Sequence, residues 1–195
     1  MARPREFDQN EALEKAMELF WAKGYERTSI ADLVSHTNVH RGSLYDTFGD
    51  KYQLFTACLD RFQRNSYDTV LGMLSGPGDP KDLLRAFFEK MIDRAMNEDD
   101  RGLKGCFLTN SALDMASFDS NIAGRVAAFN LEMESIFQRL LLQAQQNGTL
   151  SNKHTVPELA KFLVNTRYGL YAMAKTTNDR EMLQGVCRVA LSILD

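Results

Sequence analysis

Residues 39–48 combine a cluster of hydrogen-bonding side chains with a few apolar ones. They spell Val-His-Arg-Gly-Ser-Leu-Tyr-Asp-Thr-Phe, and Leu44 and Phe48 stand four residues apart, as two apolar anchors on one side of a helix would. The opposite side of that helix would expose hydrogen-bonding side chains, namely His40, Arg41, Ser43, Tyr45 and Thr47. Arginine can donate two hydrogen bonds to a guanine edge in the major groove, and hydroxyls can reach bases or phosphates. Gly42 adds no side chain, which would let the helix backbone approach a duplex closely.

Helices on both sides of this segment are expected to position it. Residues 8–23 place apolar side chains at helical spacing, and Gly24 stands where a glycine cap ends a helix. A second short helix is expected to begin at Thr28, and the turn after it contains Asn38, a residue that tolerates left-handed backbone. Two short helices joined by a three-residue turn describe a helix-turn-helix, although small helical bundles of other functions contain short helices too.

A fourth helix follows directly. Gly49 and Asp50 end the third helix, and Asp50 is placed to cap a helix that reaches about residue 74.

Two stretches of the sequence strongly resemble the DNA-binding domain of TetR-type transcriptional repressors. They are Thr28-Ser-Ile-Ala-Asp-Leu-Val and Val39-His-Arg-Gly-Ser-Leu-Tyr-Asp-Thr-Phe-Gly-Asp-Lys-Tyr-Gln-Leu-Phe, and the resemblance covers about residues 8–55. It implies that Tyr45 and Lys51 contact phosphates, and that Thr28 and Ser29 add backbone contacts at a helix N-terminus. It also implies that three residues face the bases: His40, Arg41 and Thr47.

The sequence departs from the family pattern near the turn and in the third helix. Asn38 stands where a turn glycine is common, and Asp46 would repel phosphate if it faced a duplex. We therefore expect Asp46 to lie off the interface or to bond to a neighbouring group. Arg3 and Arg5 have two interpretations, a basic arm that enters the minor groove or a solvated terminus.

The net charge does not indicate a nucleic-acid binder. The chain of 195 residues carries a formal charge of −3, so DNA binding requires that folding concentrate the basic groups on one surface. Hydrophobic residues make up 44% and charged residues 25%, which is ordinary globular usage and argues against disorder. Leucine and alanine greatly outnumber valine and isoleucine, which favours helix over strand.

These observations predict an all-α chain with an N-terminal helix-turn-helix domain over residues 1–53. A larger helical domain over residues 54–195 would bind an effector and form the dimer, as the resemblance implies. Five further helices are expected, over about residues 80–97, 106–117, 120–147, 157–175 and 179–194. The helix at 157–175 is apolar on more than one side, so one side can face the core and another a partner subunit. We therefore predict a homodimer that forms through the last two helices.

The helical body also contains aromatic, methionine and polar side chains that could line a ligand cavity. The candidates are Phe88, Met91, Cys106, Phe107, Asn110, Phe129, Met133, Tyr168 and Tyr171. Aromatic and methionine side chains at helical spacing are more often plain core, and that alternative stays open for each of them.

Cys106 carries a separate hypothesis. It lies at an expected helix start, after a loop with Arg101 and Lys104, and both features favour a reactive thiolate. Its segment resembles one in a TetR-type subgroup that senses electrophiles or oxidants through a cysteine. The alternative is a buried, inert thiol, which is also what we expect of Cys58 and Cys187.

Several function classes lack support in the sequence. The three histidines are scattered without metal-ligand spacing, and neither a phosphate-binding glycine loop nor a nucleophile elbow occurs, so we expect no enzyme, metal or cofactor. No apolar run reaches the length of a membrane span, and three cysteines are too few for a disulfide framework, which favours a reduced, cytoplasmic setting.

The resemblance implies a repressor that binds a palindromic operator in double-stranded DNA as a homodimer and is released by a small-molecule or electrophile effector. The alternatives are an activator or architectural DNA binder, and a helical enzyme or interaction module.

Overall fold

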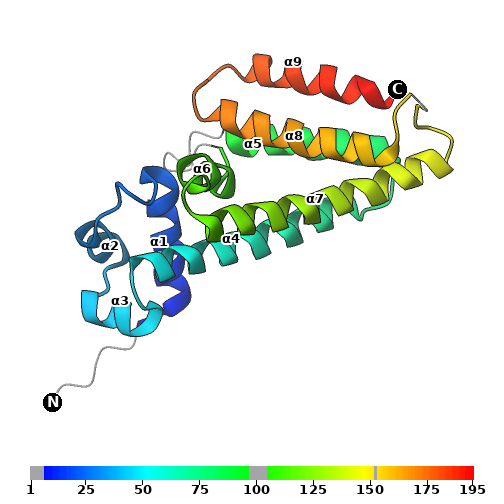
Figure 1. The fold of residues 1–195 in the computed structure, drawn as a ribbon. Coiled ribbons are helices and arrows are strands. Elements are labelled where there is room, and N and C mark those ends of the chain that lie inside the picture. Colours follow the sequence, from blue (N-terminus) through cyan, green and yellow to red (C-terminus); the bar gives the residue numbers. More distant parts are fainter. Residues whose placement is uncertain (1–6, 97–104, 152) are drawn as a thin grey trace. The chain divides into compact units, whose positions relative to one another are not determined.

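The structure is a computed structural model that describes residues 7–96, 105–151 and 153–195. Within these ranges the chain forms helices and no strand, as expected (Figure 1). The predicted helix ends lie within about three residues of the observed ones. The helices are α1 (Gln9–Lys23), α2 (Ile30–Thr37), α3 (Arg41–Phe48), α4 (Lys51–Leu74), α5 (Pro80–Ala95), α6 (Phe107–Met115), α7 (Ser120–Gln146), α8 (Val156–Ala174), α9 (Arg180–Leu191) and the 3-10 turn η1 (Ser192–Leu194).

Contacts between residues group the chain into two compact units, Met1–Arg64 (unit 1) and Asn65–Asp195 (unit 2). The predicted boundary after residue 53 falls earlier than this division. The reason is that the first half of α4 belongs to the core of unit 1, where Leu54, Phe55 and Leu59 are buried.

Local capping explains where the helices of unit 1 begin and end. The Asp8 carboxylate accepts hydrogen bonds from the backbone N–H groups of Asn10 and Glu11 at the start of α1. Gly24 ends α1 with a φ of 80°, a backbone conformation that glycine adopts without a steric penalty. The Asp50 carboxylate accepts from the backbone N–H of Gln53 at 2.8 Å, which confirms Asp50 as the residue that caps α4.

Unit 2 is a helical bundle. α7 and α8 pack along each other, and α5 packs against α7, α8 and α9. Phe88 of α5 stacks on Phe137 of α7 with ring centroids 6.1 Å apart, at the centre of this core.

The last helix has two apolar faces. The face that packs into unit 2 consists of Leu183, Cys187, Ala190, Leu191 and Leu194. Other apolar side chains of α9 point away from that core, since Val186 is 43% and Val189 74% exposed. A helix with an apolar outer face presents a surface that another helix can bury.

Candidate nucleic-acid interface

The turn between α2 and α3 is built by local interactions. Ser29 caps α2 through a reciprocal pair with Asp32, in which the Ser29 hydroxyl accepts from the Asp32 backbone N–H while the carboxylate accepts from the Ser29 backbone N–H. Asn38 ends α2 in the left-handed conformation, with φ 58° and ψ 29°, as its residue type indicates. Val39 is buried, and His40 is the N-cap residue of α3.

An ion pair between Lys23 and Asp32 reinforces the α1–α2 packing. The ammonium group of Lys23 donates to the Asp32 carboxylate at 2.9 Å. This hydrogen bond and those from Ser29 hold the pKa of Asp32 well below its usual range. The carboxylate therefore stays ionised and keeps both the cap and the interhelix contact.

α3 is anchored by a single deeply buried side chain. Leu44 is 0% exposed, whereas Phe48, the other expected anchor, is half-buried. The opposite side points outward as expected: His40 and Arg41 are exposed, and three residues are half-exposed, namely Ser43, Tyr45 and Thr47. The described residues thus leave this face of α3 accessible to solvent.

Gly42 lies on the exposed part of α3. A Cβ atom built at this position would have no heavy atom within 4 Å other than its own local backbone. The fold itself therefore does not require glycine at position 42, which leaves the space free for an external molecule.

Two cations of this region rest on aromatic rings. The Arg41 guanidinium lies 5.6 Å from the centroid of the Tyr45 ring, and the Lys51 ammonium group lies 4.3 Å from the Tyr25 centroid. Tyr25 in turn packs against Phe55 at 5.0 Å and Tyr52 at 6.0 Å. Sequence reasoning overlooked Tyr25, because its contact with Lys51 joins segments that are distant in the sequence.

Thr28 does not present a DNA-contacting side chain, contrary to the expectation. It is 0% exposed, and its hydroxyl donates to the Gly24 carbonyl oxygen at 2.7 Å. Its backbone N–H donates to the Tyr25 carbonyl oxygen. α2 begins two residues later than expected, so Thr28 closes the loop before it, while the neighbouring Ser29 is exposed.

Two other expectations concern charges. Asp46 is exposed on α3 and forms no ion pair among the described residues. Arg3 and Arg5, the suggested basic arm, lie outside the described residues.

The expected ligand residues of unit 2 form mostly core. Five apolar candidates and the Cys106 thiol are buried, each at most 4% exposed, Asn110 is 5% exposed, and Tyr171 is half-buried. Tyr168 is half-exposed and lines a groove of about 510 Å³ between α7 and α8. Burial raises the pKa of Tyr171 above its usual range, and a thiolate at Cys106 would raise it further. Cys106 is the N-cap residue of α6, so its position at a helix start is confirmed.

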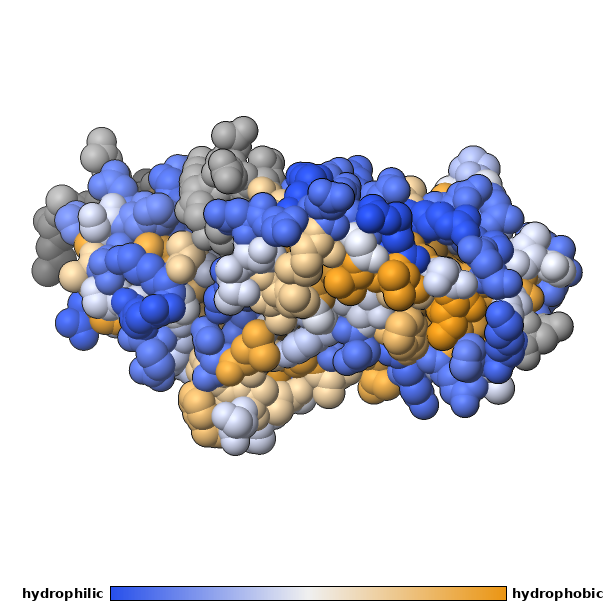
Figure 2. All heavy atoms as spheres, turned by 90° about the horizontal axis from the view of Figure 1, so that it is seen from above, coloured by the Kyte–Doolittle hydropathy of each residue, from blue (hydrophilic) through white to orange (hydrophobic). Residues whose placement is uncertain are grey.

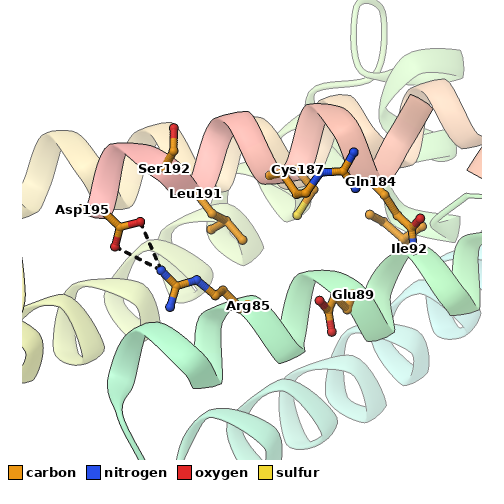
Figure 3. A pocket seen from close by; sticks show the side chains of 9 residues that line it. Arg85, Glu89, Ile92, Gln184, Cys187, Leu191, Ser192 and Asp195 are labelled. Atoms are coloured by element: carbon orange, nitrogen blue, oxygen red, sulfur yellow. Dashed lines mark hydrogen bonds and ion pairs between the residues drawn. The ribbon is translucent and has the colours of Figure 1, made fainter. Parts of the chain in front are cut away.

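A second, smaller cavity of about 250 Å³ lies between α5 and α9 (Figure 3). An ion pair between Arg85 and Asp195 lies at one end, with nitrogen and oxygen 3.1 Å apart. Cys187 and Leu191 form part of the apolar wall, and burial raises the pKa of the Cys187 thiol to about 11. This thiol is accordingly protonated at neutral pH, in line with the inert role expected from the sequence.

Known families match both units. Residues 12–58 match the family model of bacterial regulatory proteins, tetR family, and residues 80–190 match the model of the tetracyclin repressor-like C-terminal domain. The chain belongs to the TetR family. The resemblance seen in the sequence is thereby confirmed, as is the all-α plan of a helix-turn-helix domain and a larger helical domain.

Individual relatives agree with this assignment. YezE of Bacillus subtilis (strain 168), an uncharacterized HTH-type transcriptional regulator, is 35% identical over the full length of both chains. The HTH-type transcriptional repressor ComR of Escherichia coli (strain K12) is 30% identical over 98% of this chain and 90% of its own. A cysteine mutant of the TetR family transcriptional regulator CifR, complexed with 26-bp double-strand operator DNA, matches with a TM-score of 0.87 and 26% identity over 100% of each chain. This TetR-family protein is a DNA-binding transcriptional regulator.

The described residues lack the features of a membrane-spanning helix and of a metal site. Within the described ranges, none of the helices combines the length and the apolar run that crossing a bilayer requires. The same ranges contain no group of three or more histidine, cysteine, aspartate or glutamate side chains placed to hold a metal ion.

Proposed function

We propose that this TetR-family regulator is a repressor whose homodimer inserts two copies of α3 into successive major grooves of a palindromic operator. The supporting observation is the uncovered polar face of α3 opposite the buried Leu44. Arg41 would read a base, while Tyr45 and Lys51 would contact phosphates, with help from Ser29, Ser43, Thr47 and His40. Such a function places the protein in the cytoplasm, where bacterial DNA is accessible.

The dimer would form through the outer apolar faces of α8 and α9. Phe162 and Met173 are exposed on one side of α8, and Val186 and Val189 are exposed on α9. Figure 2 shows hydrophobic side chains gathered in a band on the face seen from above Figure 1, where α9 lies. An exposed apolar surface of this kind is typical of subunit interfaces. Light scattering coupled to size exclusion should give twice the monomer mass for the wild type and a monomer for Val189→Glu.

Release from DNA would require an effector that binds unit 2 and favours a conformation with wrongly spaced heads. The half-exposed Tyr168 and the buried Cys106 are the residues with which we associate this step. Cys106 is the N-cap residue of α6. Cys106→Ser should leave DNA affinity unchanged and abolish release by an electrophile such as N-ethylmaleimide. Unchanged release would assign the effector response to non-covalent binding.

The DNA-binding proposal is tested on duplexes selected from a random library with the purified protein. We expect fluorescence anisotropy to show an affinity that falls as salt rises, because phosphate neutralisation releases counterions. Arg41→Ala should relax the preference at one base pair, whereas Tyr45→Phe should weaken binding to all sequences. Arg139→Ala, which removes an exposed arginine of α7, is the matched control. Failure to select any sequence, or an affinity independent of salt, would contradict the proposal.

A further inference from the structure

Arg167 is a buried cation without an acidic partner. It lies on α8 and is 4% exposed. Its Nη2 donates to the Oδ1 atom of Asn130 at 3.1 Å, and its Nε is buried without a hydrogen-bond partner among the described residues. The guanidinium lies 5.3 Å from the Phe129 ring centroid and 5.7 Å from that of Tyr171. No acidic side chain in the described part of the chain forms an ion pair with it.

The surroundings of Arg167 differ from those of most buried charges in proteins. A charged group removed from water is normally compensated by an ion of opposite sign and by a full set of hydrogen bonds. Two aromatic rings and one neutral amide compensate the Arg167 guanidinium in part. A buried, unpaired donor with a full positive charge therefore calls for an acceptor that arrives from outside the chain.

A groove adjoins this cation. Asn130, which accepts the hydrogen bond from Arg167, also lines the groove of about 510 Å³ between α7 and α8. Tyr168, the residue after Arg167, lines the same groove. A molecule in the groove would thus meet the Asn130 amide, and displacing this amide would expose the guanidinium edge.

The groove wall is partly apolar and electrically balanced. Ala127, Leu131 and Val164 supply apolar surface, while Lys161 and Glu134 supply one charge of each sign. Its volume is within the range of small-molecule sites. The wall therefore suits a compact apolar body, and the uncompensated charge of the site is the one on Arg167.

We propose that Arg167 binds the anionic group of a small amphipathic carboxylate whose apolar body occupies the groove between α7 and α8. A guanidinium and a carboxylate match in geometry, because the two parallel N–H donors of the first meet the two oxygens of the second. The inference rests on the proposed effector response of unit 2, and it names the chemical class of that effector.

The test compares charged and neutral ligands of equal size. Sodium benzoate and sodium octanoate are each added to the full-length protein at increasing concentrations, and so are the neutral amides benzamide and octanamide. The unfolding temperature of the protein is measured with each compound. We expect the carboxylates to raise Tm by about 5–10 °C at roughly 100 times their Kd, and the amides to leave it unchanged. Equal shifts from acids and amides, or no shift from either carboxylate, would overturn the proposal.

Substitutions then assign the effect to Arg167. Arg167→Met removes an unpaired buried charge, so without ligand it should unfold at the wild-type temperature or above it, and it should lose the carboxylate shift. Arg167→Lys should keep a reduced shift, and Arg139→Met, an exposed α7 control, should keep all of it. Reduced stability of ligand-free Arg167→Met would mean that the guanidinium is structural, and would refute the proposed role.

A role for Arg167 in activating Cys106 is the competing explanation. The pH dependence of iodoacetamide alkylation separates the two. The proposal would be wrong if Arg167→Met shifted the pH dependence of Cys106 alkylation while the carboxylates left the Tm of the wild type unchanged. The guanidinium would then act on the Cys106 thiol and not on a bound carboxylate. DNA binding without ligand is measured in parallel, so that a failure of the operator proposal is recognised independently.

Discussion

Replacing Gly42 by alanine should change stability and DNA affinity in opposite directions. Apart from the local helix backbone, a methyl group at this position would meet no heavy atom of the described residues within 4 Å, so the substitution creates no clash with them. Alanine is favoured over glycine inside helices by roughly 0.5–1 kcal/mol. For a chain of this length, that gain corresponds to a rise in Tm of about 1–4 °C.

The same methyl group should weaken binding to DNA. If the backbone of α3 approaches the duplex at Gly42, a Cβ atom forces the helix outward and lengthens the hydrogen bonds that Arg41 and Ser43 would form. We expect at least a tenfold loss of affinity, or about 1.4 kcal/mol. Fluorescence anisotropy on a selected operator measures this loss, and differential scanning calorimetry measures Tm.

Gly72→Ala is the matched control for this prediction. Gly72 is an exposed glycine in α4, and its added Cβ would likewise meet no heavy atom within 4 Å. It should raise stability without any effect on DNA affinity. Wild-type affinity in Gly42→Ala would show that the α3 backbone stays away from the duplex, and the proposed docking of α3 would then be wrong.

Substitutions at three further positions test the surroundings of α3. Tyr25→Leu removes the aromatic ring that lies against Lys51, so DNA affinity should fall about two- to fivefold and should depend less steeply on salt concentration. Tyr25→Phe keeps the ring and should bind DNA like the wild type. Equal DNA affinity of the two variants would refute this positioning role of Tyr25. Asp46→Asn removes an exposed negative charge from α3, so it should tighten binding to all DNA sequences at low salt but not at high salt. Weaker binding to the operator alone would show instead that Asp46 contacts a base. Asp32 has a lowered pKa in the folded state, so its carboxylate contributes stability above the ordinary aspartate pKa, and this stability is lost as pH falls through the lower folded value. Chemical denaturation should therefore show that Asp32→Asn lowers the free energy of unfolding at pH 7 and has less effect as the solution becomes strongly acidic. If the variant and the wild type differed in unfolding free energy by the same amount at every pH, the stabilising role of the Asp32 carboxylate would be refuted.

Sequence reasoning succeeded where structure is local. The glycine cap at Gly24, the left-handed turn residue Asn38 and the capping role of Asp50 each depend on a few neighbouring residues, and all three are confirmed. The outward face of α3 follows from helical periodicity and from one apolar anchor, Leu44. These features are encoded in short segments, so one sequence suffices to infer them.

Features that depend on tertiary packing were not predictable in the same way. Thr28 has the residue type of a helix cap, but its burial depends on how the loop after α1 folds over the core. The contact of Tyr25 with Lys51 joins two segments across unit 1. Arginine is rarely buried without an acidic partner, so residue type gave no reason to single out Arg167 among the polar positions of α8.

The structure also resolves the conflict between a net charge of −3 and DNA binding. Most described acidic groups of the helix-turn-helix region are engaged locally: Asp8 and Asp50 cap helices, and Asp32 pairs with Lys23. Similar ion pairs are Glu11–Lys15 and Glu14–Arg61, and the Glu18 carboxylate lies 3.6 Å from the His36 imidazole.

Arg41 and Lys51, in contrast, form no ion pair among the described residues and rest instead on the rings of Tyr45 and Tyr25. An aromatic ring holds a cation in place without neutralising its charge, so both remain available to phosphates. Because surface fields are screened within about 10 Å at 0.1 M salt, a duplex against α3 would respond to these nearby cations and to Asp46 rather than to the charge of the whole chain.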